Sequence, residues 1–251
     1  MASNAAFSPA ILIPVYNHEA AIKHTLNAVL QYEWPVLLVD DGSKISCQLV
    51  LTTLREQHAD RVALLRLERN SGKGAAVKAG IKWLHTKGYS HAIQVDADGQ
   101  HDLADLPTLV ALAELHPLVL VTGYPTYDDS IPLVRYYSRY LTHIWIWINT
   151  LSFQVRDSMC GFRAYPLAQT TPLLEREKCG DRMDFDMEIL VRWLWSRGKI
   201  KDFPTKVTYP LDGISHFNIW QDNLLISWMH CRLFFGMLRR SPAIIWRKLY
   251  G

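Results

Sequence analysis

Two carboxylates stand one residue apart at the end of a short apolar run, and this spacing can hold a metal ion. Residues 92–95 lead directly into Asp96-Ala97-Asp98-Gly99-Gln100-His101. Acids at positions i and i+2 beyond a strand can turn their oxygens toward one point. Hard oxygen ligands suit Mg²⁺ or Mn²⁺, which keep open positions for substrate phosphates. The alternative is a solvated turn, because Asp and Gly are common turn residues.

Two further polar clusters follow apolar runs in the same way. The run 10–14 ends in Pro14-Val15-Tyr16-Asn17, and the run 36–39 ends in Asp40-Asp41-Gly42-Ser43. Ligands of open parallel sheets bind outside the carboxyl ends of the strands. Three polar clusters on one rim are hard to explain as unrelated turns, so the sequence favours a ligand site there.

The elements that must position these clusters alternate between strand and helix as far as Gly123. Apolar runs predict strands at 10–14, 36–39, 62–67, 92–95 and 118–122. Helical spacing predicts helices at 19–31, after Ser46, at 75–85 and at 103–115, with Asn17 and Ser46 as the first two N-caps. This order predicts an α/β protein with a mostly parallel central sheet and helices on both faces.

The pattern changes after Gly123. It predicts helices at 130–152, 182–197 and 217–240, a turn with a short strand at 157–165, and a strand at 200–209 interrupted by Pro204. No linker composition divides the chain. We therefore expect a catalytic domain over residues 1–216 and an amphipathic helical extension over residues 217–251.

Composition excludes several classes of protein. The chain has 251 residues and a net charge of +3, without the clustered basicity of a nucleic-acid binder. Its four cysteines are scattered without a Cys-x-x-Cys pair, which argues against zinc and redox motifs and favours a reduced cytosol. The first residues do not resemble a secretory signal, and no apolar run reaches the ~18 residues of a spanning helix.

Five motifs occur in an order that points to one family. They are Pro14-Val15-Tyr16-Asn17, Val39-Asp40-Asp41-Gly42-Ser43, Asn70-x-Gly72-Lys73-Gly74, Asp96-Ala97-Asp98-x-Gln100-His101 and Gly161-Phe162-Arg163. Together they resemble a family-2 glycosyltransferase of GT-A fold, and most closely the polyprenyl-phosphate (dolichyl-phosphate) mannose synthase branch. The resemblance covers roughly residues 11–216. Single motifs are weak, but their order and context support one another.

The resemblance implies a role for each motif. Residues that would contact the donor nucleotide sugar, a UDP- or GDP-sugar, are Pro14, Tyr16, Glu19, Asp40 or Asp41, Lys73, Asp96, Ala97, Arg135 and Arg139. Asp96, Asp98 and Gln100 would hold Mg²⁺ or Mn²⁺ on the sugar diphosphate, and Asp98 is the residue on which activity should depend most. Lys73 could approach a phosphate from its glycine-rich turn, or could be an ordinary solvated lysine. Arg135 and Arg139 could bind a phosphate bidentately, or could simply lie on a solvated helix face.

The departures from the family pattern concern base recognition and phosphate binding. His18 stands where the family commonly has Glu, and Glu19 follows it. The stretch 123–126 lacks the arginine of the mannose synthases, and their Arg and Lys around a Gly-x-Ser motif are missing at 210–216. Two or three expected phosphate-binding cations are thus absent, which weakens the inference of a lipid-phosphate acceptor.

The catalytic base is open at this point. A phosphate acceptor is already anionic and needs none, whereas a hydroxyl acceptor needs a general base. Asp157, Asp184 and Asp186 are the candidates. The acids at 184, 186 and 188 cannot all share one helix face, and they could instead compensate the helix dipole.

The resemblance thus implies an inverting, metal-dependent glycosyltransferase with a lipid-linked acceptor. The alternatives are a catalytically weak nucleotide-binding homologue that acts as a partner module, and transfer to a soluble hydroxyl acceptor. A nucleotidyltransferase is disfavoured, because residues 14–17 do not form its Gly-rich, Lys/Arg-bearing loop. The apolar stretch 217–238 with nearby cations could dock the enzyme on the cytosolic face of an anionic membrane, or could pack on the sheet or on a second subunit.

Overall fold

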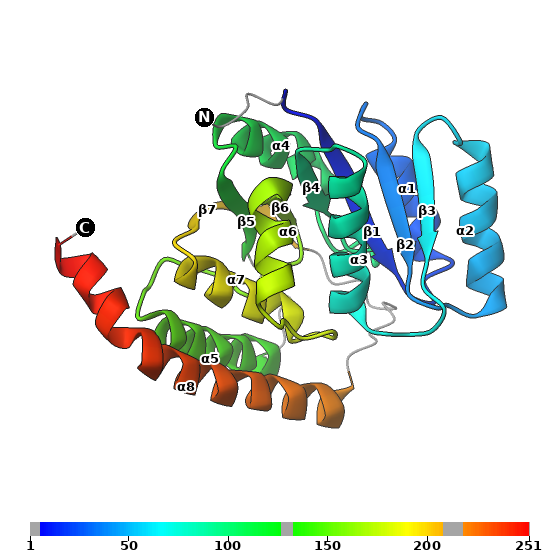
Figure 1. Cartoon of the computed structure of the whole chain (residues 1–251). Coiled ribbons are helices and arrows are strands. Elements are labelled where there is room, and N and C mark those ends of the chain that lie inside the picture. Colours follow the sequence, from blue (N-terminus) through cyan, green and yellow to red (C-terminus); the bar gives the residue numbers. More distant parts are fainter. Residues whose placement is uncertain (1–5, 127–132, 208–217, 251) are drawn as a thin grey trace.

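The computed structural model describes residues 6–126, 133–207 and 218–250, and it shows an α/β protein built on one central sheet (Figure 1). The strands are β1 (Pro9–Val15), β2 (Val36–Asp40), β3 (Val62–Arg66), β4 (His91–Gln94), β5 (Val119–Thr126), β6 (Arg163–Pro166) and β7 (Lys199–Lys206). The helices are α1 (Ala21–Val29), α2 (Ile45–Gln57), α3 (Lys73–Thr86), α4 (Leu106–Leu115), α5 (Leu133–Thr150), α6 (Leu167–Arg176), α7 (Phe185–Trp195) and α8 (Ile219–Tyr250), with a 3₁₀ turn at Leu103–Asp105.

The strands follow the order β3-β2-β1-β4-β6-β5-β7 across the sheet. Parallel pairing joins β1 to β2 and β4, β2 to β3, and β5 to β7. Only β6 among these strands runs antiparallel to its neighbours, β4 and β5, so β5 itself runs in the direction of β4. The predicted mostly parallel sheet with flanking helices is confirmed, and β1, β2, β4 and β5 end at one edge.

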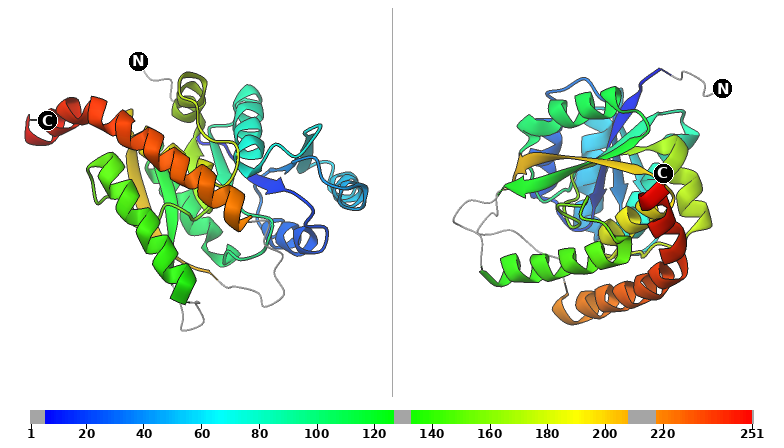
Figure 2. Two further views of the ribbon diagram at one scale, coloured as in Figure 1. Left: turned by 90° about the horizontal axis from the view of Figure 1, so that it is seen from below. Right: turned by 90° about the vertical axis from the view of Figure 1, so that its left-hand side faces the viewer.

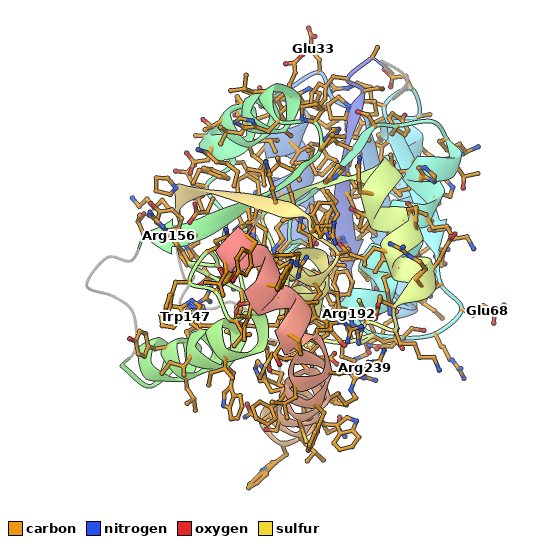
Figure 3. All side chains as sticks on the ribbon, turned by 60° about the vertical axis from the view of Figure 1, so that its left-hand side comes forward. Glu33, Glu68, Trp147, Arg156, Arg192 and Arg239 are labelled. Carbon is orange, nitrogen blue, oxygen red and sulfur yellow. The ribbon has the colours of Figure 1, made fainter. Side chains whose placement is uncertain are left out.

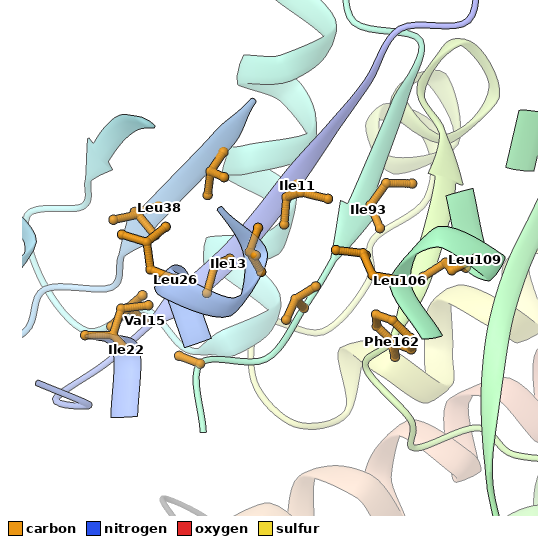
Figure 4. Close-up of a cluster of buried hydrophobic side chains, with 14 of the residues drawn as sticks. Ile11, Ile13, Val15, Ile22, Leu26, Leu38, Ile93, Leu106, Leu109 and Phe162 are labelled. Atoms are coloured by element: carbon orange, nitrogen blue, oxygen red, sulfur yellow. The ribbon is translucent and has the colours of Figure 1, made fainter. Parts of the chain in front are cut away.

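The core lies on both faces of the sheet, because the central strands are apolar on both sides. Ile11, Ile13 and Val15 of β1 point to one face, where they pack with side chains of α1 and α4 (Figure 4). Ala10 and Leu12 alternate with them and belong to the core on the other face, with α3 and α7. A strand buried on both sides reads as a continuous apolar run, which is why such runs located the strands.

The first two helices begin without the side-chain caps that the sequence predicts. Ala20 and Lys44 occupy the N-cap positions, and neither makes a side-chain cap hydrogen bond. Asn17 has a positive φ of 51°, and its Oδ1 accepts the backbone N–H of Lys44 at 2.8 Å. The predicted capping roles of Asn17 and Ser46 were therefore wrong. Asn17 instead joins two loops at the carboxyl edge, a use of its side chain that competes with capping.

Two helices differ from the sequence pattern. The sequence did not predict α6, which carries Pro172 in its interior. The C-terminal helix α8 continues well past the predicted end at Arg240, although Pro242 lies within it. Proline removes one backbone hydrogen bond and usually interrupts a helix, so local propensity argued against both segments. Packing on neighbouring helices outweighs that cost here, since α6 packs on α3 and α8 packs on α5 and α7.

Helices α5 and α8 lie side by side, below the sheet in the view of Figure 1 and in front in the left view of Figure 2. Glu188, a buried acid of α7, links α7 to α8, because Arg232 NH2 of α8 lies 3.1 Å from its Oε2. Arg192 NH2, from the next turn of α7 itself, lies 2.6 Å from its Oε1. Among the described residues, no helix is both long enough and apolar enough to cross a membrane.

Candidate active site

Asp96 stands directly beyond the end of β4, and donors surround its carboxylate. Gln94 Nε2 donates to Oδ1 at 3.2 Å, and Lys73 Nζ donates to Oδ2 at 2.9 Å. His101 Nε2 lies 3.4 Å from the same Oδ2. Gly161 borders the carboxylate so closely that a Cβ atom there would stand 2.4 Å from Oδ2. The Gly-Phe-Arg turn and the Asp-x-Asp segment therefore form one site.

Lys73 links this carboxylate to a second one on α7. Its Nζ atom lies 2.9 Å from Asp186 Oδ2 and 2.9 Å from Asp96 Oδ2. The ammonium thus lies between two carboxylates, whereas the sequence suggested either a phosphate contact or a solvated lysine. Burial lowers the pKa of Lys73, but the charges of Asp186 and Asp96 outweigh burial and hold that pKa above its ordinary value. Lys73 is therefore a fixed positive charge at neutral pH.

Asp98 and Gln100 lie on the loop after β4. The Asp98 Oδ1 atom accepts the backbone N–H of Gln100 at 3.1 Å. Burial and the charge of Asp96 raise the pKa of Asp98, because both disfavour a second carboxylate. Burial acts in the same direction on Asp96, but the charge of Lys73 and the hydrogen bond from His101 lower its pKa overall. A bound cation would stabilise the ionised form of Asp98.

These groups fit a divalent ion that shares its coordination with a bound ligand. Asp96, Asp98 and Gln100 offer the hard oxygen atoms that Mg²⁺ and Mn²⁺ prefer. Within the described ranges, no group of three or more His, Cys, Asp or Glu side chains could hold an ion by itself. An ion at this loop would therefore take further ligands from water and from a substrate diphosphate, as Mg²⁺ commonly does.

Asp40 and Asp41 follow β2, and both carboxylates are engaged. Asp40 Oδ1 accepts the backbone N–H of Ser43 at 2.9 Å, and its Oδ2 accepts Arg66 Nε at 2.8 Å. Asp41 accepts two backbone N–H groups of the glycine-rich turn, those of Ser71 and Gly72, each at 2.8 Å. Asp40 thus anchors its own loop to β3, while Asp41 holds the glycine-rich turn against the carboxyl edge.

The residues after β1 lie beside the same loops. Pro14 and Tyr16 are half-buried, and Glu19 accepts a hydrogen bond from Ser46 Oγ at 3.3 Å. Helix α1 also supports the Asp-x-Asp segment, because the hydroxyl of Thr25 donates to the Ala97 carbonyl at 3.3 Å. The pairing order β2-β1-β4 therefore brings the three predicted polar clusters to one rim, as the sequence indicated.

Asp157 and Arg139, which the sequence suggested separately as a base and as a phosphate ligand, bind each other. Arg139 NH2 lies 2.8 Å from both oxygens of Asp157, and Nε lies 3.1 Å from Oδ2. His143 Nε2 lies 3.3 Å from Oδ2, and two backbone N–H groups of the same turn donate to Oδ1. Burial raises the pKa of Asp157, but Arg139 and His143 lower it overall. Asp157 is thus a fully engaged turn anchor, while the side chain of Arg135 lies outside the described residues.

The three acids at the start of α7 point in different directions, as their spacing indicated. Asp184 Oδ1 accepts the backbone N–H of Arg182 at 3.2 Å, within its own loop. Asp186 binds the lysine described above, and its Oδ1 lies 3.8 Å from Arg163 NH1. Glu188 turns toward α8. Of the three, only Asp186 reaches the surroundings of the Asp-x-Asp segment.

Sequence reasoning missed the buried polar support behind the site. The Tyr165 hydroxyl donates to Gln94 Oε1 at 3.2 Å, and Gln94 in turn donates to Asp96. Arg163 is fully buried, and its NH1 atom donates to the Asp186 carbonyl at 2.6 Å. Arg163 therefore supports the backbone of α7 at Asp186 and does not reach the Asp-x-Asp segment itself. Gln94 was the available signal, because a polar side chain inside an apolar strand requires a buried partner.

A guanidinium from another loop lies near the end of β5, although the stretch 123–126 itself contains no arginine. Arg156, from the loop after α5, donates through NH1 to the Tyr124 hydroxyl at 3.1 Å (Figure 3). Its Nε atom lies 3.0 Å from Asp202 Oδ2, so an acid already compensates its charge. The other positions at which the resemblance predicts cations, within 208–217, lie outside the described residues.

Comparison with known proteins decides the family. The family model described as Glycosyl transferase family 2 matches residues 10–179. This chain belongs to glycosyltransferase family 2. The matched residues include all three polar clusters at the carboxyl edge, together with the glycine-rich turn and the Gly-Phe-Arg turn.

The curated relatives place the chain in the polyprenyl-phosphate branch of the family. A dolichyl-phosphate beta-glucosyltransferase of Dictyostelium discoideum is 29% identical over 205 residues, which cover 72% of this chain and 60% of that enzyme. A UDP-N-acetylglucosamine–dolichyl-phosphate N-acetylglucosaminyltransferase of Methanococcus voltae is 26% identical over 215 residues, covering 79% of this chain and 85% of the relative. The chain thus spans less than two thirds of the first of these relatives.

A solved structure supports the fold. A mannosyltransferase from Pyrobaculum calidifontis, in complex with GDP-Man and Mn²⁺, superposes with a TM-score of 0.57 at 16% identity. The match covers 94% of this chain and 67% of that one. It confirms the predicted GT-A architecture, including the C-terminal part of this chain.

Proposed function

We propose that this protein transfers a sugar from a UDP- or GDP-sugar to a lipid-linked acceptor, with inversion at the anomeric carbon. The observation that carries the proposal is the cluster of Asp96, Asp98 and Gln100 at the carboxyl edge of a family-2 sheet. The two curated relatives named above act, by their names, on dolichyl phosphate. A polyprenyl phosphate or a glycolipid is the corresponding acceptor class here.

The residues of the rim would hold the donor by its diphosphate and its nucleoside. Asp98 and Gln100, with Asp96 beside them, would bind Mg²⁺ or Mn²⁺ on the diphosphate. When bound, the ion neutralises the charge that develops on the leaving nucleoside diphosphate. Pro14 and Tyr16 would border the base and ribose, next to the loop that follows β2. The leaving group then needs no proton, and the acceptor oxygen attacks the sugar directly, which inverts its configuration.

The candidate bases are already bound by cations or by backbone N–H groups, and this favours a phosphate acceptor. Asp157 is bound by Arg139 and His143, and Asp186 is bound by Lys73. Asp184 accepts a backbone N–H of its own loop. A hydroxyl acceptor would need a base within hydrogen-bond reach, whereas a phosphate monoester is already anionic. The geometry of these acids therefore supports the lipid-phosphate acceptor that the missing cations had weakened.

A two-dimensional screen tests the transfer reaction. UDP- and GDP-sugars are combined with Mn²⁺ or Mg²⁺ and with either a short polyprenyl phosphate in detergent or soluble sugar alcohols, and released nucleotide is measured. We expect release to require both the metal and the polyprenyl phosphate. Release that responds only to soluble hydroxyl acceptors would replace the acceptor class. Nucleotide binding without turnover for any pair would favour a nucleotide-binding partner module.

The C-terminal helix supplies a surface suited to working at a membrane. One face of α8 packs inward, with Met229, Leu233 and Met237 buried against the rest of the protein. The opposite face exposes large apolar side chains, namely Trp220, Leu224, Trp228, Phe235, Leu238, Trp246 and Leu249. Helix α5 beside it adds exposed Leu141 and Trp145. The inward face of α8 thus packs on α5 and α7, and the opposite face supports the proposal of membrane docking.

The charge that α5 and α8 present at the surface is positive. The α5 sequence contains no acid, and the single acid of α8, Asp222, is buried. Arg232 and Arg240 pair with glutamates of the helical layer, whereas Arg239 is exposed on α8 (Figure 3). Lys248 is exposed as well, with its ammonium donating to the Leu151 carbonyl just after α5. Aromatic and aliphatic side chains with cations are typical of helices that lie in an anionic membrane interface, and each such cation contributes about 1 kcal/mol.

Liposome flotation tests the membrane proposal, which assigns the protein to the cytosolic membrane face. We expect flotation with anionic vesicles at low salt and loss at high salt, because exposed charges are screened. Trp220→Ser with Trp228→Ser should abolish it. Ile45→Ser with Leu49→Ser is the matched control, since these residues are 75% and 63% exposed on α2, away from this surface. A protein that ignores anionic vesicles but forms a dimer would assign the face to a second subunit instead.

A further inference from the structure

We propose that Lys73 and Asp186 form a positioning pair that makes metal binding conditional on the donor diphosphate. Lys73 acts as a fixed monovalent cation beside Asp96, and Asp186 holds Lys73 in place and moderates its charge. The inference rests on the proposed ion at Asp96 and Asp98. It assigns Asp186 to the metal site and removes it from the candidates for a general base.

The geometry holds the lysine rigidly at this position. Lys73 begins α3 immediately after Gly72, whose φ of 104° is in the left-handed region that favours glycine. Asp41 binds the backbone N–H of Gly72 at 2.8 Å, and the Ala75 N–H donates to the Asp181 carbonyl at 2.8 Å. The turn is thus fixed on two sides, and the side chain of Lys73 is only 18% exposed. Its ammonium is directed to the carboxylates by the backbone as well as by charge.

The donors around Asp96 explain why an ion alone would bind weakly. Lys73 and Gln94 donate to different oxygens of this carboxylate, and His101 lies 3.4 Å from one of them. A divalent ion must compete with these donors for the lone pairs of Asp96. Like charge also opposes it, because Lys73 remains protonated beside the same atoms. Asp98 is then the remaining acid of the motif, and one carboxylate holds Mg²⁺ or Mn²⁺ poorly without further oxygen ligands.

A bound diphosphate would make binding of the metal ion favourable. Its oxygens would supply both the missing ligands and the negative charge that offsets Lys73, so the ion and the donor would bind together. Thermodynamic linkage then requires each to raise the affinity of the other by the same factor. The pair therefore suppresses loading of the site with metal alone.

Removing either partner of the pair should change metal affinity in opposite directions. Lys73→Met removes the competing cation and leaves Asp96 and Asp186 as free carboxylates, so Mn²⁺ alone should bind about tenfold or more tightly than to the parent protein. Asp186→Asn leaves Lys73 to Asp96 alone, so Mn²⁺ should bind about tenfold or more weakly. The double variant removes one charge of each sign and should lie near the parent. Tenfold corresponds to about 1.4 kcal/mol, well below the interaction of two adjacent buried charges.

The test measures Mn²⁺ binding to the full chain by titration calorimetry, first without nucleotide and then with saturating UDP or GDP. Lys82→Met is the matched control, because Lys82 lies on the same helix, nine residues beyond Lys73, and is exposed. Thermal melts confirm that each variant is folded. The pair is supported if the two single variants shift Mn²⁺ affinity in opposite directions without nucleotide, and if the double variant cancels the shifts.

The outcomes separate this inference from the function on which it rests. Weaker Mn²⁺ binding in both single variants would mean that the pair is only structural and would overturn the inference. The same holds if Asp186→Asn binds Mn²⁺ normally but loses turnover that saturating Mn²⁺ does not restore, because Asp186 would then act as a base. A parent protein that binds nucleotide but never binds Mn²⁺ or Mg²⁺ would overturn the proposed metal site itself, and the inference with it.

Discussion

Asp98→Asn is the substitution that tests the proposed reaction most directly. It keeps the size of the side chain and the acceptor oxygen for the Gln100 N–H, which Asp98 binds at 3.1 Å. It removes the negative charge that a divalent ion would need. Lys73 and Gln94 already engage the neighbouring Asp96, so the chain offers little compensation for this loss.

The expected magnitude follows from the charge that is lost. Two unit charges about 4 Å apart interact by ~4 kcal/mol at an effective dielectric of ~20, and a divalent ion doubles this. Dehydration of the ion offsets much of that gain. Removal of one preorganised electrostatic group in an active site typically costs ~10²–10³-fold in turnover. We therefore expect activity to fall at least ~10²-fold, together with weaker metal-dependent binding of the donor.

The assay is released nucleotide as a function of Mn²⁺ concentration at saturating donor and acceptor. Asp102→Asn is the matched control in the same loop, because Asp102 is exposed and caps the following turn by accepting the Ala104 N–H at 3.0 Å. Asparagine serves equally well at an N-cap, so the control should keep its activity. If Asp98→Asn turns over at a near-normal rate with an unchanged Mn²⁺ dependence, the assignment of this loop to the metal is refuted.

Two further predictions concern the donor loops and the helical layer. Asp41→Ala releases two backbone N–H groups of the glycine-rich turn, so we expect calorimetry to show about tenfold weaker UDP or GDP binding by a folded protein; unchanged affinity would make Asp41 an ordinary turn residue. Burial lowers the pKa of His230 to about 4, whereas an unfolded chain binds this proton near pH 6.5. The unfolded state therefore takes up more protons between pH 6.5 and 4, and the free energy of unfolding should fall by up to ~1.4 kcal/mol per pH unit as the pH drops through that window. Urea midpoints at pH 7.5 and 5.0 should show a smaller acid loss in His230→Gln, and an equal loss in both proteins would contradict the assignment.

Much of the fold could be predicted because its signals are local. Strands buried on both faces appear as apolar runs, and their alternation with helices restricts the sheet to a mostly parallel order. A short strand was predicted within 157–165, where β6 begins, but its antiparallel direction could not be found in this way, because strand direction depends on the path of the chain between strands. Helix α6 was missed for a different reason: Pro172 argues locally against a helix that tertiary packing nevertheless maintains.

The candidate site, like the fold, could be predicted only in part. Its place on the rim followed from strand order, since parallel strands end at a common edge. The partners of its charged groups did not, because they lie far apart in the sequence. Lys73 and Asp186 meet only through the packing of α3 near α7, and Arg139 meets Asp157 only when α5 folds back on the turn before β6. Each of these residues was identified as a candidate, but the sequence suggested phosphate or solvent as the partner of cations that bind carboxylates in the fold.

The C-terminal helix shows why composition alone leaves such questions open. We predicted an amphipathic helical extension over residues 217–251, but apolar residues occur around most of the circumference of this helix and reduce the amphipathic contrast, so its inward face cannot be read from the sequence. The fold supplies the contrast through Glu188, a buried acid that requires a cation. Arg232 of α8 provides that cation together with Arg192. This pairing joins α8 to α7, while Met229, Leu233 and Met237 are buried on the inward face of the helix and Trp228 is 60% exposed. The face of α8 that we propose for membrane contact is thus the one that packing on α5 and α7 leaves exposed.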